Sequence, residues 1–193
     1  MPLPSRSAGS SQLTTPAWTL GGLVGLLWGV QILNVGLLGG RLIFQGIYPR
    51  QMDGLQGILW APLLHGSFQH LMANTIPLLT LGGLILLGQA KDFWVVTVMA
   101  ALVSGLGTWL IGAPGSVHIG ASGIVFGYFG YLLLRSYFER SAFAITASIL
   151  VIVFYGGFWW GVLPTQPGVS WEGHLFGFVG GSLAAWALSR RPA

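Results

Sequence analysis

The sequence predicts an all-α membrane protein built as a bundle of six transmembrane helices. Of its 193 residues, 53% are hydrophobic and 6% are charged, whereas an ordinary soluble domain carries about 25% charged residues. The mean hydropathy of +0.75 points the same way. These observations exclude a water-soluble domain, a disordered chain and a nucleic-acid-binding module, and a surplus of four positive charges is too small for a basic patch. The third observation is a series of six apolar runs of about the length that crosses a bilayer.

Charged residues and turn formers separate these runs, which are each expected to form one helix. They cover residues 17–39, 67–88, 93–112, 117–134, 141–163 and 171–188. Residues 1–16 are rich in Ser and Pro and are expected to be a disordered N-terminus. Residues 17–189 would form the helical domain, and 190–193 a short tail. Within the domain, residues 40–66 are too polar to span and too apolar to extend into water, which predicts an interfacial loop with one or two short helices.

The basic residues predict the orientation of the bundle. Two of them, Arg41 and Arg50, fall on one side of a six-helix topology. Six fall on the other side: Arg6, Lys91, Arg135, Arg140, Arg190 and Arg191. The positive-inside rule therefore places both termini in the cytoplasm. The small size and the absence of a transit peptide favour a bacterial inner (plasma) membrane, and the absence of cysteine excludes disulfides, thiolate zinc sites and cysteine nucleophiles.

Four polar residues converge just below the outer surface in this topology. The second, fourth and sixth helices all run inward, so their first two turns share one depth. That zone holds His70 and Asn74, which share one helix face, together with Ser122 and His174. Polar groups within a membrane are costly and indicate function. Glycines spaced along the fourth and sixth helices would let the two backbones approach closely enough for Ser122 to reach His174.

These residue types predict covalent catalysis. Ser122 can act as a nucleophile and His174 as its base. His70, Asn74 and the backbone amide of Ser122 can donate hydrogen bonds to a developing oxyanion. No carboxylate is clearly available to orient His174, because Glu172 lies on a different face of the same helix. A dyad is therefore favoured over a triad.

Other reaction classes lack the residues they need. An aspartyl dyad needs two carboxylates within the membrane, a Ser–Lys dyad needs a lysine near Ser122, and a zincin needs an H-E-x-x-H motif; none of these is present. A metal or haem site stays open as an alternative, because all four histidines fall on the outer side. Two of them, His65 and His118, are otherwise expected to be structural, with His65 joining the first loop to the second helix.

The same residues resemble the motifs of the rhomboid intramembrane serine proteases. The stretch from His65 to Asn74 is similar to the family's H-x4-H-x3-N pattern on the second helix. Gly120-Ala121-Ser122-Gly123, followed by Phe126-Gly127, resembles its G-x-S-G segment. Gly173-His174-Leu175-Phe176-Gly177, with Gly180-Gly181, resembles its sixth-helix motif, A/G-H-x-x-G-x-x-x-G. The three motifs stand in the family's order and extend over most of the chain.

The resemblance implies hydrolysis of a peptide bond in or beside a transmembrane segment of a substrate protein. Ser122 would attack the carbonyl, His174 would shuttle the proton, and His70, Asn74 and the Ser122 amide would form the oxyanion hole. No metal, nucleotide or other cofactor would be required. The implied partners are transmembrane substrate proteins and the lipid bilayer, without nucleic acid, and the oligomeric state stays open. The first loop would be a scaffold, and the fifth helix with residues 158–168 would gate substrate access.

The chain departs from the family pattern at some positions. Phe126 stands where many members have Tyr, so it can stack on the His174 ring but cannot donate a hydrogen bond. The Trp-Arg pair often seen in the first loop is missing, and Arg41 or Arg50 would have to serve instead. No seventh helix is expected, which predicts a minimal six-helix form.

Two alternatives to an active protease remain at this point. One is a catalytically silent relative that binds membrane clients. The presence of both Ser122 and His174 argues against it. The other is a small transporter or haem-binding protein, for which the sequence offers no inverted repeat.

Overall fold

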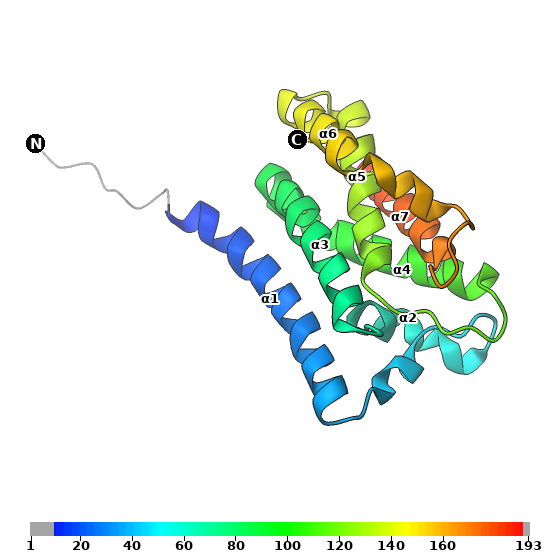
Figure 1. The fold of residues 1–193 in the computed structure, drawn as a ribbon. Helices are drawn as coiled ribbons and strands as arrows, with labels where there is room; N and C mark the ends of the chain where they lie inside the picture. The colour runs from blue at the N-terminus through cyan, green and yellow to red at the C-terminus, as the bar shows by residue number, and fades with distance from the viewer. Residues whose placement is uncertain (1–9, 191–193) are drawn as a thin grey trace, which may run out of the picture.

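The computed structural model describes residues 10–190 and is all-helical in this range, apart from one isolated bridge (Figure 1). Six long helices follow the six predicted runs in order: α1 (Ser10–Gly36), α3 (Phe68–Gln89), α4 (Phe93–Ile111), α5 (Ser122–Glu139), α6 (Ala142–Tyr155) and α7 (Trp171–Ser189). Two short 3-10 helices, η4 (Ala90–Asp92) and η5 (Gly156–Val162), extend α3 and α6. The prediction of an all-α bundle is confirmed.

Four helical segments are long and apolar enough to cross a membrane. They are Ala17–Gly36, Phe68–Gly88, Ala90–Ile111 and Ala142–Val162. Within the described residues, α5 and α7 do not meet the same criterion of length and hydropathy. These two helices pack against each other at the centre of the bundle, and α5 is buried along most of its length. Because their surfaces face protein more than lipid, they can hold polar residues that a lipid-facing helix would exclude.

Glycines bring the backbones of α5 and α7 into direct contact. A methyl group added to Gly177 would lie 2.9 Å from the carbonyl carbon of Gly123 and 3.0 Å from its Cα. Small residues at such positions are what allows two membrane helices to approach this closely. Ser122, the first residue of α5, and His174, in the first turn of α7, therefore start from helices whose separation is set by backbone contact.

The segment between α1 and α3 forms a series of short helical turns. The sequence predicts one or two short helices there, and the structure has four: η1 (Arg41–Gln45), η2 (Met52–Leu55), α2 (Gly57–Trp60) and η3 (Ala61–Leu63). Ile47 and His118 exchange two backbone hydrogen bonds of 2.9 and 3.0 Å, and the Gly120 N–H donates to the Ala61 carbonyl at 2.8 Å. This first loop therefore supports the chain directly ahead of Ser122.

Arg50 anchors the first loop to the end of α4. Its guanidinium donates to the Leu110 carbonyl at 3.0 Å, and its backbone N–H donates to the Trp109 carbonyl at 2.9 Å. The Trp109 indole donates back to the Gln51 carbonyl at 2.8 Å. The last carbonyls of a helix have no partner within the helix, and a cation is favourable there. Of the two arginines considered for this loop, Arg50 makes these contacts, while Arg41 is exposed at the start of η1.

Several element boundaries differ from the prediction, among them the end of α5, which extends to Glu139 where the predicted run ends at residue 134. Helix α1 begins at Ser10, so residues 10–16 are helical although the sequence predicted disorder for 1–16; adding residues to an existing helix costs far less than nucleating one. Residues 1–9 and 191–193 of the predicted termini lie outside the described residues. Helix α5 begins at Ser122 and not near residue 117, because residues 117–121 pair with the first loop.

Candidate active site

A cavity of about 730 Å³ lies at the end of the bundle where α3, α5 and α7 begin. In Figure 1 this is the end that also carries the first loop, opposite the start of α1 and the end of α7. The cavity lining includes all five site residues predicted from the sequence: His70 and Asn74 of α3, Ser122 and Phe126 of α5, and His174 of α7. Residues from three helices, up to about a hundred positions apart in the chain, therefore surround one space.

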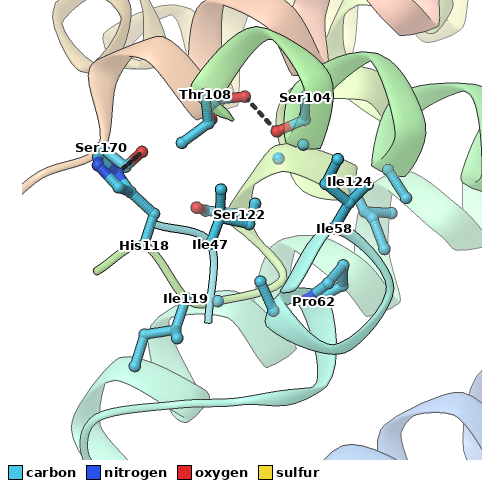
Figure 2. Close-up of a pocket in the computed structure, with 16 residues that line it drawn as sticks. Ile47, Ile58, Pro62, Ser104, Thr108, His118, Ile119, Ser122, Ile124 and Ser170 are labelled. Atoms are coloured by element: carbon cyan, nitrogen blue, oxygen red, sulfur yellow. Dashed lines mark hydrogen bonds between the residues drawn. The ribbon is translucent and has the colours of Figure 1, made fainter. Parts of the chain in front are cut away.

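Ser122 lies between this cavity and a smaller pocket behind it. The smaller pocket has a volume of about 30 Å³, and Ser104 and Thr108 of α4 line it with Ser122 (Figure 2). Ser104 Oγ donates to the Gly173 carbonyl at 2.7 Å, which joins α4 to the start of α7. As the first residue of α5, Ser122 also presents a backbone N–H that the helix itself cannot satisfy, and the helix dipole favours negative charge at this place.

Gly120 brings the start of α5 close to α3. Its φ of +118° lies in a region that residues with side chains rarely adopt. A methyl group at Gly120 would lie 2.8 Å from His70 Nε2 and 3.6 Å from Asn74 Nδ2. Both side chains therefore face the backbone two residues before Ser122, an approach that only glycine permits.

Asn74 has an amide donor without a partner. The residue is 5% exposed, and its Nδ2 makes no hydrogen bond to any described residue. A buried polar group without a partner costs about 1–3 kcal/mol and calls for an explanation. Because Asn74 lines the cavity beside Ser122, a bound group with an acceptor oxygen would satisfy this donor.

Two contacts fix the His174 ring. Its Nδ1 lies 2.9 Å from the Gly161 carbonyl oxygen in η5, and the ring stacks on Phe126 with a centroid distance of 4.0 Å and an angle of 8°. A carbonyl oxygen only accepts hydrogen bonds, so this contact assigns the ring proton to Nδ1 and leaves Nε2 as an acceptor. The role of Gly161 could not be predicted from the sequence, because every residue has a backbone carbonyl.

His118 has more contacts than the structural loop role expected for it. Its Nδ1 lies 2.7 Å from Ser170 Oγ, and its Nε2 lies 2.7 Å from Ser116 Oγ. It thus joins the segment before α5 to the residue before α7. Burial lowers the pKa of His118, and the Glu172 carboxylate opposes this shift. Glu172 is itself buried in the cavity lining, a position that the sequence analysis did not foresee.

His65 supports the backbone directly ahead of Ser122. It is fully buried, and its Nε2 accepts from the Ala121 N–H at 3.4 Å, next to Ser122. Burial lowers the pKa of His65 to about 4, and the neighbouring His70 adds to the shift, so the ring stays neutral and able to accept. The predicted tie between the first loop and the second helix thus also reaches α5. Within residues 10–190, no group of three or more His, Cys, Asp or Glu is placed to hold a metal ion.

These features define a polytopic integral membrane protein with a cavity at one end of its helix bundle, into which several polar side chains face. The Rhomboid domain family model matches residues 53–191, and the chain belongs to the rhomboid family. It is similar to Uncharacterized protein Rv1337 of Mycobacterium tuberculosis, with 44% identity over 187 residues that cover 90% of this chain and 78% of the relative. Uncharacterized protein ML1171 of Mycobacterium leprae is 40% identical over 206 residues, covering 98% and 81%. YdcA of Bacillus subtilis, named as a candidate rhomboid protease, is 29% identical over 128 residues, covering 64% and 62%.

Proposed function

We propose that this protein is an intramembrane serine endopeptidase that cleaves transmembrane segments of other membrane proteins. The observation that carries the proposal is the shared cavity, in which a serine at a helix N-terminus, a histidine with a free Nε2 and an unpartnered Asn74 amide stand together. These are the nucleophile, the base and an oxyanion donor that peptide hydrolysis needs. Membership of the rhomboid family supports the same reaction class.

In the proposed reaction, Ser122 Oγ attacks the carbonyl carbon of the scissile peptide bond while His174 Nε2 takes the hydroxyl proton. The oxyanion that forms accepts hydrogen bonds from the Asn74 amide, the His70 ring and the Ser122 N–H. The C–N bond then breaks, and the His174 imidazolium protonates the leaving amine. Water, deprotonated by His174, hydrolyses the acyl-Ser122 ester and restores the free enzyme.

The proposed location of the reaction follows from the charge distribution. The positive-inside rule favours both termini in the cytoplasm of a bacterium, with the cavity toward the outer side of the inner membrane. Buried polar groups within a bundle indicate a water-accessible site, and hydrolysis requires such access. A transmembrane substrate would come laterally from the bilayer and meet the site near the membrane surface.

The first test uses a fluorophosphonate, which reacts with activated serines without a substrate protein. We expect intact mass spectrometry of the detergent-solubilised protein to show one adduct on the wild type and none on Ser122→Ala or His174→Ala. Ser182→Ala is a matched control, because this α7 serine bonds to the Phe178 carbonyl of its own helix and should label like the wild type. Incubation with a membrane protein that bears a single transmembrane helix then tests cleavage.

Each other outcome has a definite meaning. Labelling that survives Ser122→Ala would show that the nucleophile is misassigned. Absence of both labelling and cleavage in the folded wild type would contradict the protease proposal and favour a silent relative that binds membrane clients. In that case, co-purification of the test substrate with the unlabelled protein would measure the binding function directly.

A further inference from the structure

We propose that the backbone carbonyl of Gly161 is the positioning group for His174, in the role that a carboxylate has in a catalytic triad. The inference rests on the proposed function, because it concerns the base of that reaction. The contact joins Nδ1 of His174 to the Gly161 oxygen at 2.9 Å and connects the start of α7 to η5. A base needs its proton on the nitrogen remote from the nucleophile, and an acceptor at Nδ1 selects that tautomer.

The position requires a residue without a side chain. A methyl group added to Gly161 would lie 3.2 Å from His174 Nδ1 and 2.7 Å from Phe126 Cζ. Both distances are below ordinary van der Waals contact, so any larger residue would push the ring away from the carbonyl. Glycine therefore allows the backbone to come close enough to act as the acceptor.

The carboxylates of the chain are placed elsewhere. Asp92 accepts a hydrogen bond from Tyr131 at 3.0 Å and Glu139 pairs with Arg135, both near the other end of α5. Asp53 is exposed in η2 of the first loop. Glu172 precedes His174 by two residues, so it leaves α7 from a different face, and its electrostatic influence is on His118.

The same segment also supports the His174 ring through its face. Phe158 of η5 stacks on Phe126 with a centroid distance of 4.8 Å and an angle of 22°, and Phe126 stacks on His174. Residues of η5 thus hold the ring at its edge, through Gly161, and behind its face, through Phe158. No residue of η5 is itself buried, so the segment keeps its position through such contacts. Alignment of the base consequently depends on η5 lying against α7.

A neutral carbonyl acts differently from a carboxylate. Hydrogen bonds to charged groups are worth about twice those between neutral groups. The Gly161 carbonyl therefore selects the tautomer and orients the ring, while it stabilises the imidazolium less than an anion would. We therefore expect that loss of this contact gives a mixture of the two His174 tautomers while the protein still folds.

The experiment measures the tautomer and the reactivity separately. Selective ¹⁵N-histidine labelling and NMR in detergent report which ring nitrogen of His174 carries the proton, with His174→Gln used to assign the signals. We expect the wild type to be protonated at Nδ1, and Gly161→Ala to show a mixture of tautomers with a labelling rate by fluorophosphonate about 10–100-fold lower. Gly157→Ala is the matched control, because a methyl there, in the same helix, meets nothing within 4 Å. It should match the wild type in both measurements.

A second control isolates the carbonyl from the stacking ring. Phe126→Leu removes the stacking partner but leaves the Gly161 carbonyl in the chain, so its His174 should keep the proton on Nδ1. If wild-type His174 carries its proton on Nε2, or if Gly161→Ala labels at the wild-type rate, the proposal is wrong. The NMR result stands even if the wild type fails to label. Failure of this inference is thereby distinguishable from failure of the proposed function.

Discussion

Replacing Gly177 with alanine is expected to push α5 and α7 apart next to the proposed dyad. Gly177 lies three residues after His174, and its contact residue Gly123 directly follows Ser122. The new methyl would stand 2.9 and 3.0 Å from two backbone carbons of Gly123, whereas carbon atoms in contact prefer about 3.5–4.0 Å. The Gly123 carbonyl oxygen would be closer still, so the two backbones must separate by at least about 1 Å at this point.

The expected consequences differ in size for stability and for activity. Overpacking of this kind costs about 1–3 kcal/mol of stability. A displacement of reacting groups by about 1 Å can lower a rate by about 100-fold. We therefore expect Gly177→Ala to fold with a lowered thermal midpoint and to lose about two orders of magnitude in the rate of fluorophosphonate labelling.

The matched control is Gly25→Ala on α1, where a methyl group meets nothing within 4 Å. The chemical change is identical, and the exposed helix should gain up to about 1 kcal/mol from reduced backbone entropy of the unfolded chain. Labelling rates and thermal midpoints of the two variants are measured in the same detergent. If Gly177→Ala labels within twofold of Gly25→Ala, backbone contact between α5 and α7 does not set the geometry of the site.

Three further predictions concern single side chains. Asn74→Ala should lower turnover by about 10–1,000-fold while the thermal midpoint stays level or rises, because its buried Nδ2 has no partner to lose; unchanged turnover would remove it from the oxyanion hole. The free energy of unfolding of the wild type should be highest above about pH 6.5 and fall toward pH 4, since His65 has a pKa near 6.5 in the unfolded chain and of about 4 in the folded chain. His65→Gln should remove up to about 3 kcal/mol of this fall, which is seen as a flatter dependence of the thermal midpoint on pH. An equally steep dependence would contradict the assignment. Tyr155→Phe or Thr80→Val removes the hydrogen bond between α6 and α3. The helix α6 is expected to gate access to the cavity, and this bond holds it against α3. Since such a bond is worth about 1 kcal/mol, either change should speed labelling by a bulky fluorophosphonate up to about fivefold. Additive effects in the double variant would rule out a shared bond.

Much of the architecture could be predicted from the sequence because a bilayer restricts the possibilities. A spanning helix has a narrow range of lengths, and charged residues mark its ends, so the sequence predicts six runs, and the structure has six long helices in the same order. The direction of the helices predicts that His70, Asn74, Ser122 and His174 share one depth. The structure gathers all four around one cavity, and Phe126 with them.

Boundaries near the first loop were harder to predict. Apart from His118, residues 117–121 are apolar and continuous with the run that follows, so composition favours a helix from about residue 117. Their backbone instead pairs with Ile47 and Ala61, which lie more than fifty residues earlier in the chain. A contact of that range has no local pattern, and it decides that Ser122 stands at the helix N-terminus and not within the second turn.

The amino-acid pattern is enough to predict the side chains of the proposed chemistry, because histidine and asparagine are expensive to bury in an apolar chain and Ser122 is expected at the same depth as they are. How the proposed base is held depends on the fold. The Gly161 carbonyl at His174 Nδ1, the Gly120 approach to His70 and the contact of Gly177 with Gly123 all involve backbone atoms. Every residue has the same backbone groups, so the folded arrangement alone selects which of them meet.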